Sequence, residues 1–541
     1  MINTQDKAIG AVQSITSVAK YQLNPQAVYQ QLCAHKHNNL LLESAEIDKK
    51  HQLKSLLLTD AALKIVGQGQ QVIFTALTLN GEAALAYAKA QLADVAKLTE
   101  SNQGTQLIAE FAISPTELDE KSRLLAPNPL QSLRLFTQLK NPQNHPFAVF
   151  LAGVFAFDLM AIAEHLPEVE DGVNNCPDFV YYLAETLIVI DHEQRTTELI
   201  GNIFSGVHQQ KCYFEISRRI AQLTTLLAQP ITPVSTPNST ASTPNTPITV
   251  DIDDARFCQI VETLKQHIRV GDIFQVVPSR CFSLPCYNNL AAYQALKQSN
   301  PSPYMFYVND SEFCIFGASP ESAIKYQHTN RQVEIYPIAG TRPRGFNKQG
   351  ELSLDLDSRL ELELRQDKKE LAEHIMLVDL ARNDVARVSQ AGTRYVAELL
   401  KVDRYSHVMH LVSRVCGTLQ PELDALHAYQ ACMNMGTLSG APKVKATSLI
   451  RQMEAKRRGS YGGAVGYITG DGDMDTCIVI RSAFVKNQMA YVQAGAGVVY
   501  DSIPQAEADE TRQKAQAVLS AIQTANALYD NNKECSNESN L

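Results

Sequence analysis

The sequence predicts an α+β fold with large, mainly antiparallel β-sheets and flanking helices. Short runs rich in apolar and β-branched residues, at 71–75, 186–191, 314–317 and 491–494, predict strands. These runs do not alternate with helices at the spacing of βαβ units, and no GxGxxG string follows a strand, which argues against a doubly wound nucleotide-binding fold. Hydrophobic residues make up 45% and charged residues 19% of the chain, as in ordinary globular proteins.

A low-complexity segment divides the 541 residues into two parts. Residues 229–250, QPITPVSTPNSTASTPNTPITV, are uncharged and rich in Pro, Ser, Thr and Asn, which is typical of a flexible or polyproline-like linker. We therefore expect an N-terminal region at 1–228 and a C-terminal domain at 251–525. The polar residues 526–541 predict a disordered tail.

Two segments of the C-terminal part predict helices. Residues 368–385, KKELAEHIMLVDLARNDV, place Glu373 beside an apolar stripe. The second helix is expected after Asp501 and Ser502, which can cap its N-terminus, with a proline in the first turn. In that helix Glu510 and Lys514 lie one turn apart, which is the spacing of an ion pair.

Charge and hydropathy limit the partners and the compartment. The net charge of -9 argues against a nucleic-acid partner, because no basic excess can neutralise phosphates. An anionic substrate then needs a local metal or individual Arg and Lys side chains. The first twenty residues contain no apolar signal segment, and the longest apolar run, 147–157, is too short to cross a bilayer and predicts a buried strand. We expect a cytoplasmic protein without membrane contact.

The 11 cysteines are scattered without CxxC pairs, which predicts reduced thiols rather than a disulfide framework or a zinc ribbon. Cys281 and Cys286 lie close in sequence, as do Cys33, His35 and His37. Neither set has a matching second group of ligands, so we expect no metal at either place.

Six strings of the C-terminal part resemble the chorismate-utilising enzymes. They are PIAGTRPRG (337–345), AEHIMLVDLARND (372–384), GTLSGAPKVKA (436–446), GSYGGAVGY (459–467), IRSA (480–483) and QAGAGVVYDSIPQAEADETRQKA (493–515). Within that family the chain is similar to the large subunit, component I, of anthranilate synthases, and the resemblance extends from LLLES (40–44) to about residue 525. It implies that 251–525 is a chorismate-binding catalytic domain and that 1–228 contributes part of a tryptophan regulatory site.

The resemblance implies a reaction in which chorismate and ammonia give anthranilate and pyruvate, the first committed step of tryptophan biosynthesis. Chorismate carries two carboxylates, so the site needs compensating positive charge. The family holds Mg²⁺ with two glutamates, which the motifs assign to Glu373 and Glu510. Hard Mg²⁺ prefers oxygen ligands and can clamp a carboxylate. From spacing alone, both residues are equally compatible with solvated helix surfaces, and Glu510 with an ion pair to Lys514.

The resemblance also implies the residues that contact chorismate and act on it. The Gly-rich stretch after a strand lets backbone amides approach a carboxylate, and an arginine can bind one with two hydrogen bonds. Hydroxide leaves poorly from the ring, so a general acid is needed, which the family analogy assigns to Glu321, with His410 in the elimination step. The implied substrate contacts are Gly340, Thr341, Tyr461, Arg481, Gly495, Ala496, Gly497 and Lys514.

Two departures from related families indicate the subtype. Isochorismate and salicylate synthases carry a water-activating lysine where this chain has Gln275, and a neutral amide cannot act as that base. Aminodeoxychorismate synthases carry a nucleophilic lysine in a PIKGT string, whereas this chain has Ala339. Both departures favour direct attack by ammonia. Aminodeoxychorismate synthase component I and a catalytically inactive tryptophan-sensing paralogue remain the alternatives.

The resemblance further implies a partner and an inhibitor. No Gly-x-Cys-x-Gly nucleophile turn is present, so ammonia should come from a separate glutamine amidotransferase subunit, component II, in a heterotetramer or a simpler heterodimer. The end product tryptophan should bind between two segments, LLLES (40–44) and NPSPYMFY (300–307). The implied inhibitor-binding residues are Glu43, Ser44, Pro303, Tyr304 and Met305.

Overall fold

The computed structural model describes residues 9–44, 53–113, 118–231, 247–347, 349–405 and 408–538. Its central feature is a pair of long neighbouring strands, β3 (Lys54–Gln68) and β8 (Phe179–Asp191). Register shifts between Leu58 and Leu63 interrupt their pairing. Because bulges bend strands, the sheet turns here and continues as two arms.

One arm begins with the strand that pairs with the first half of β3, and the other begins with the strand that pairs with the first half of β8. The first arm contains β2 (Asn39–Glu43), β13 (Tyr304–Asn309), β14 (Cys314–Ser319), β23 (Ser482–Lys486), β24 (Met489–Gly495), β12 (Ser279–Pro285) and β10 (Thr249–Val250). The second contains β7 (Phe150–Phe155), β21 (Ala464–Thr469), β22 (Met474–Ile478), β15 (Ser322–Gln327), β16 (Gln332–Ile335) and β19 (Val408–Thr418).

Shorter extensions complete the sheet at several edges. These are β9 (Thr196–Phe204) and β1 (Val12–Ala19) beside β8, β4 (Gln71–Ala76), β6 (Gln106–Glu110) and β5 (Lys97–Ser101) beside β3, and β17 (Ile338–Pro343) and β18 (Tyr395–Arg404) beside β19. β11 (Gln275–Val276) and β20 (Gly440–Ala441) form a separate two-stranded sheet. All pairs between these strands are antiparallel, which confirms the predicted α+β class.

The two predicted parts of the chain share this sheet. β2 pairs with β13, and β7 pairs with β21, so strands from 1–228 form the middle of the sheet and strands from 251–525 extend it on both sides. Residues 232–246 of the predicted linker lie outside the described residues, and the strand β10 already begins at Thr249. The linker therefore joins two segments that fold into one sheet.

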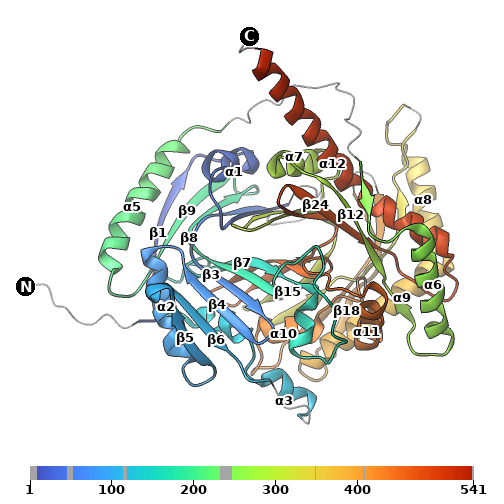
Figure 1. Cartoon of the computed structure of the whole chain (residues 1–541), viewed down its shortest axis with the longest axis horizontal. Helices are drawn as coiled ribbons and strands as arrows, with labels where there is room; N and C mark the ends of the chain where they lie inside the picture. Colours follow the sequence, from blue (N-terminus) through green and yellow to red (C-terminus); the bar gives the residue numbers. More distant parts are fainter. Residues whose placement is uncertain are drawn as a thin grey trace, which may run out of the picture.

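Three apolar layers hold the fold together. Leu58, Tyr182, Phe306 and Val465 belong to a cluster between the two arms. On the outer face of one arm lie α1 (Pro25–Cys33), α5 (Gln209–Leu226), α7 (Asn289–Ser299) and α12 (Pro504–Glu538), with α5 at the left and the other three along the top of Figure 1. The outer face of the other carries α2 (Leu79–Leu92), α3 (Glu120–Leu125), α4 (Gln131–Arg134), α9 (Lys368–Val388) and α10 (Ala425–Cys432).

The remaining helices lie close to the predicted site. α6 (Asp254–Arg269) and α11 (Lys443–Glu454) share a smaller apolar cluster, and α8 (Leu354–Gln366) packs beside β17 and β19. Three 3₁₀ turns, η1 (Asn102–Gly104), η2 (Leu135–Gln138) and η3 (Phe157–Ile162), complete the described secondary structure.

Both predicted helices are present. α9 begins at Lys368, where the Asp367 side chain accepts hydrogen bonds from two backbone amides of the first turn. α12 begins at Pro504 and continues to Glu538, so the residues from 526 to 538, predicted as a disordered tail, are helical. The apolar run at 147–157 contains the buried strand β7, as predicted. The described cysteines are all free thiols. In the described part of the chain, none of the helices has the length and apolarity needed to span a membrane.

Candidate active site

Arg481 connects most of the residues that the motifs single out. It lies between β22 and β23, and its charge interacts with Tyr461, Glu510 and Glu321. The charge of Arg481 also acts on His410. Side chains from four separate segments therefore converge on one guanidinium.

The backbone and the side chain of Arg481 are both unusual. Its φ of 49° lies in the left-handed region, which non-glycine residues rarely adopt and which recurs at functional sites. Its carbonyl accepts a hydrogen bond from the Ala318 amide at 3.1 Å. Burial lowers the pKa of the guanidinium, and among the described residues no side chain forms an ion pair or hydrogen bond with it. A buried cation without a partner suits an anionic ligand.

Glu321 is the buried carboxyl of this group. It sits between β14 and β15, and Thr437 Oγ1 donates a hydrogen bond to its Oε1 at 3.0 Å. Burial raises the pKa of Glu321 to about 8, against the opposing effects of Thr437, Lys514 and Arg481. The carboxyl therefore holds its proton at neutral pH, as a general acid requires.

His410 and Thr341 face each other across paired strands. They are register partners in β19 and β17, and His410 Nδ1 lies 3.0 Å from Thr341 Oγ1. Burial lowers the pKa of His410 to about 4, so the imidazole is neutral near pH 7. Gly340 has a φ of 79°, and the strand pairing shifts register at this position, which turns Thr341 toward the histidine.

The Gly495–Gly497 stretch forms a close-packed wall. A Cβ atom on Gly495 would lie 2.8 Å from the Pro278 carbonyl and 3.0 Å from the Tyr461 hydroxyl, so only glycine fits. Lys514 Nζ donates to the Gly495 carbonyl at 3.0 Å. Burial raises the pKa of Tyr461 to about 12, so its hydroxyl keeps its proton. Ala496 is fully buried, and its amide donates to the Pro278 carbonyl.

The two predicted metal ligands, Glu373 and Glu510, come from different helices and lie within electrostatic range of each other. Burial raises the pKa of Glu373 to about 7; Lys369 opposes this rise, and the carboxylates of Glu370, Glu507 and Glu510 add to it. Each glutamate also has a lysine neighbour. Lys514 Nζ lies 2.5 Å from Glu510 Oε1, the pair that spacing predicts, and Lys369 Nζ lies 3.7 Å from Glu373 Oε1.

These carboxylates fit a divalent cation. Facing carboxylates repel one another, and a cation between α9 and α12 would remove that repulsion. Within the described ranges no group of three or more acidic, His or Cys side chains has the arrangement of a metal cage. Mg²⁺ is commonly held by one or two carboxylates together with waters and the substrate, so a pair of glutamates is sufficient.

Sequence reasoning missed several residues of this region. Thr437 contacts Glu321 from the GTLSG string, and a hydroxyl in a Gly-rich loop gives no signal of its own. Glu370 and Glu507 each lie one helical turn before a predicted metal ligand. The Glu-x-x-Glu spacing in both helices was a signal that could have found them, because residues three apart share a helix face.

The predicted inhibitor residues lie together on adjacent strands of the first arm. Glu43 of β2 pairs with Met305 of β13, and Ser44 Oγ donates to the Pro303 carbonyl at 2.5 Å. The Tyr304 hydroxyl donates to Asp475 at 3.1 Å. Residues 45–52, which follow Ser44 directly, lie outside the described residues.

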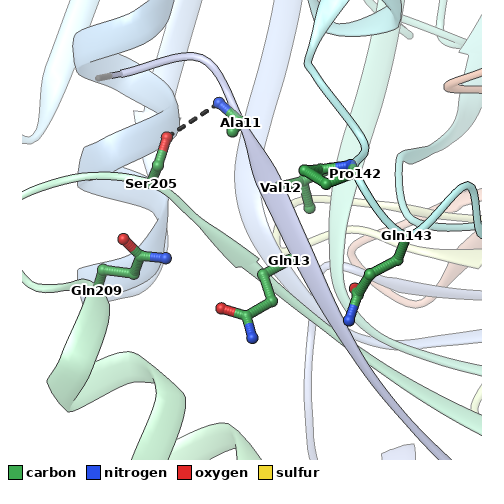
Figure 2. Close-up of a pocket in the computed structure, with 7 residues that line it drawn as sticks. All are labelled: Ala11, Val12, Gln13, Pro142, Gln143, Ser205 and Gln209. Atoms are coloured by element: carbon green, nitrogen blue, oxygen red, sulfur yellow. Dashed lines mark hydrogen bonds between the residues drawn. The ribbon is translucent and has the colours of Figure 1, made fainter. Parts of the chain in front are cut away.

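Two cavities differ in their suitability for a charged ligand. One of about 400 Å³ lies beside β1, where Figure 2 shows amide, hydroxyl and apolar side chains, including Gln13, Gln143 and Ser205, and no ionisable group. It offers neither a cation nor an acid. A smaller one of about 20 Å³ is lined by Glu321, Asp384, Thr437 and residues of α9, and it adjoins the cluster around Arg481.

The chain is similar to known proteins over most of its length. The family model described as "chorismate binding enzyme" matches residues 88–520. Anthranilate synthase component 1 of Vibrio cholerae is 56% identical over 520 residues, which cover 95% of this chain and 97% of that protein. The corresponding protein of Escherichia coli K12 is 53% identical over 512 residues, covering 94% and 97%. The crystal structure of anthranilate synthase component I from Streptococcus pneumoniae superposes with a TM-score of 0.65 at 29% identity, covering 92% of this chain and 97% of that one.

Proposed function

The chain belongs to the chorismate-binding enzyme family, in its anthranilate synthase component I branch, and from that premise we propose how its residues carry out the reaction. Chorismate and ammonia give anthranilate, pyruvate and water. The observation that carries this assignment is the convergence of Glu321, Tyr461, Glu510 and His410 on the buried charge of Arg481.

Chorismate binds with one carboxylate at Arg481. The buried guanidinium has no partner among the described residues, and a carboxylate can accept two parallel hydrogen bonds from it. Tyr461, Lys514 and the Gly495–Gly497 backbone lie next to one another, and Gly340 and Thr341 contact His410. These contacts fix the ring between the general acid and the histidine.

Mg²⁺ is the proposed metal, with Glu373 and Glu510 as the residues that hold it. When bound, the cation neutralises negative charge on a substrate carboxylate. The chain's own contribution is to place two carboxylates from α9 and α12 within electrostatic range of each other. Lys369 and Lys514 accompany these carboxylates and limit the local negative charge.

Glu321 supplies the proton that the first step needs. Ammonia forms a bond to C2, the C4–O bond breaks, and the C4 hydroxyl leaves as water with the proton of Glu321, while the new ammonium nitrogen on C2 releases one proton to water. The pKa of about 8 keeps this carboxyl protonated before the step. In the second step C2 loses its proton and the ether bond at C3 breaks. The enolpyruvate released takes up a proton to become pyruvate, and the aromatic amine remains. Neutral His410 takes part in this elimination, since an unprotonated imidazole can accept a proton.

Ammonia comes from a separate glutamine amidotransferase, component II. The sequence has no nucleophile turn for glutamine hydrolysis, and delivery between subunits keeps ammonia unprotonated. Gln275 and Ala339 support ammonia as the direct nucleophile, because neither can activate water or attack the ring itself. The complex is a heterotetramer or a heterodimer in the cytoplasm.

Tryptophan inhibits the enzyme from the pocket formed by Glu43, Ser44, Pro303, Tyr304 and Met305. A short path of backbone pairs supports this coupling. Tyr304 and Met305 pair with Ser319 and Ala318 of β14. The Ser319 hydroxyl accepts from the Glu321 amide at 3.3 Å, and the Ala318 amide donates to the Arg481 carbonyl. A shift of β13 would therefore move both Glu321 and Arg481. By linkage, tryptophan that weakens chorismate binding is itself bound more weakly when chorismate is present.

One assay tests this function. The purified chain is incubated with chorismate, Mg²⁺ and ammonium, and anthranilate is followed by its fluorescence before and after tryptophan is added. We expect anthranilate to form and tryptophan to suppress it. Formation of 4-amino-4-deoxychorismate instead would assign the aminodeoxychorismate reaction. Tryptophan binding without consumption of chorismate would identify a regulatory protein that has lost catalysis.

A further inference from the structure

We infer that Arg458 is a positioning residue that does not touch the substrate. It joins three walls of the active site, which are the loop of Thr437 and Leu438, the segment of Val277 and Pro278, and Tyr461. This inference rests on the function proposed above. Arg458 follows α11, precedes Tyr461 by three residues, and is 1% exposed. A buried guanidinium needs acceptors for its N–H groups, so the partners that it selects show what it holds in place.

The first two walls are joined by backbone carbonyls. Arg458 Nη1 donates to the Leu438 carbonyl at 2.8 Å, and Nη2 donates to the Val277 carbonyl at 2.6 Å. Leu438 directly follows Thr437, the residue that donates to Glu321. Val277 begins the segment whose Pro278 carbonyl receives the Ala496 amide. One side chain therefore ties the loop at the general acid to the segment beneath the glycine stretch.

A buried carboxylate fixes the guanidinium from the opposite side. Arg458 Nε and Nη2 donate to the two oxygens of Glu454 at 2.9 and 2.6 Å. The same carboxylate accepts from the Ser279 amide at 2.7 Å and from its hydroxyl at 2.8 Å. Ser279 is the register partner of Gly495. The ion pair is thus hydrogen-bonded on both sides, which offsets the cost of burying it, and it anchors the strand that supports Gly495.

The third wall is Tyr461. The guanidinium carbon of Arg458 lies 5.6 Å from the centre of the Tyr461 ring and 4.6 Å from the Phe157 ring. The Arg458 amide donates to Asp158 at 2.9 Å, which fixes the backbone just before the tyrosine. The Tyr461 ring is consequently held from behind while its hydroxyl approaches Gly495.

The chemistry of these contacts requires arginine. Its planar fork serves two carboxylate oxygens and two carbonyls at once, whereas the ammonium of lysine is a point charge on a flexible stem. Arg458→Lys keeps the charge and removes this geometry. Arg457→Lys is a matched control, because Arg457 is the chain neighbour of Arg458 and its guanidinium pairs with Asp178, outside all three walls.

The test compares both variants with the wild type, using chorismate, Mg²⁺ and ammonium without the amidotransferase. We expect Arg458→Lys to lower kcat about 100-fold with a smaller change in KM, the loss typical of misplaced reacting groups, while Arg457→Lys changes kcat less than about twofold. Thermal unfolding accompanies each assay. Ser279→Ala, which removes one hydroxyl from Glu454, should lower kcat by a smaller factor and serves if Arg458→Lys does not fold.

The result that overturns the inference is a normal kcat in a folded Arg458→Lys or Ser279→Ala variant with a lowered Tm, since Arg458 would then only stabilise the fold. Equal losses of kcat in the Arg457 and Arg458 variants would overturn it as well. If the wild type makes no anthranilate, the proposed function fails on its own.

Discussion

Two neighbouring regions of the molecule both bury charged side chains, but only one of them pairs these charges within the chain. The frame region, Arg458 with Glu454 and Ser279, meets its hydrogen-bonding needs within the chain. The reaction region comprises Arg481, Glu321 and His410. Within the described residues the guanidinium of its arginine has no hydrogen-bond partner, and burial raises the pKa of its glutamate and lowers that of its histidine. Groups that hold a fold find partners in the chain, whereas groups kept available at an energetic cost mark the place of a ligand.

The largest expected effect is the loss of turnover when a proposed metal ligand, which belongs to neither region, is replaced. Glu373→Gln should remove nearly all Mg²⁺-dependent turnover, because the amide no longer carries the charge that binds the cation. Its Tm should stay equal or rise, since one of several mutually repelling carboxylates disappears. Activity is measured across a Mg²⁺ titration, with Lys369→Met as the control that leaves both glutamates in place. Normal turnover in Glu373→Gln would remove the metal assignment.

Removal of the unpartnered arginine sharpens the comparison next. Arg481→Met should reduce kcat/KM for chorismate by roughly 1000-fold, in line with the loss of a charge-assisted bidentate contact in a buried site. Its Tm should be unchanged or higher, because a buried cation without a partner no longer has to be accommodated. A fall in Tm with kcat/KM preserved would place Arg481 in the frame region.

Neutralising the acid should have a comparable but smaller effect. Glu321→Gln should lower kcat by about 100-fold, the lower end of the range for loss of a general acid, with little change in chorismate affinity. Glu321→Asp, which retains an acid with a shorter side chain, is the control and should recover part of the rate. Equal rates for the amide and the wild type would exclude Glu321 as proton donor.

The pH dependence follows from the same carboxyl. Because burial raises the pKa of Glu321 to about 8 from an ordinary value of 4.5, the folded state retains a proton that the unfolded state loses. This group therefore makes the free energy of unfolding fall as pH rises from about 4.5 to 8. Activity that needs the protonated acid should also decline above about pH 8. Chemical denaturation at pH 5 and pH 8 should show a smaller difference for Glu321→Gln than for the wild type.

The smallest effect on catalysis is expected at the inhibitor pocket. Ser44→Phe should leave anthranilate formation nearly unchanged and relieve tryptophan inhibition, because the ring would fill the space beside the Pro303 carbonyl. Inhibition curves for the two proteins provide the measurement. Inhibition equal to that of the wild type would show that tryptophan binds elsewhere.

The sequence predicts some features of this molecule better than others. The helix α9 from Lys368 followed from apolar periodicity, and the start of α12 at Pro504 followed from capping candidates and a proline in the first turn, all of which are local properties. The helical continuation of α12 past residue 526 did not, because polar composition alone does not exclude a helix. The insertion of N-terminal strands between two sets of C-terminal strands in one sheet depends on long-range pairing that no local pattern encodes.

The candidate site divides in the same way. Family motifs led to Arg481, Glu321 and His410, and the structure adds that one guanidinium lies within electrostatic range of the other groups. Nothing in RRGSY distinguishes Arg457, which pairs with Asp178, from the fully buried Arg458. Their roles depend on which side of the backbone faces Leu438 and Val277, and only the folded chain determines that.

The most direct test of the account measures the binding of chorismate with Mg²⁺, in the absence of ammonium, by titration calorimetry for the wild type and for Arg481→Met. If the Arg481 guanidinium binds a carboxylate of chorismate, the wild type binds chorismate and the variant binds it at least about tenfold more weakly, because one charge-assisted contact is lost. Equal affinities in the two proteins would contradict the account, because the substrate would then have no need of Arg481.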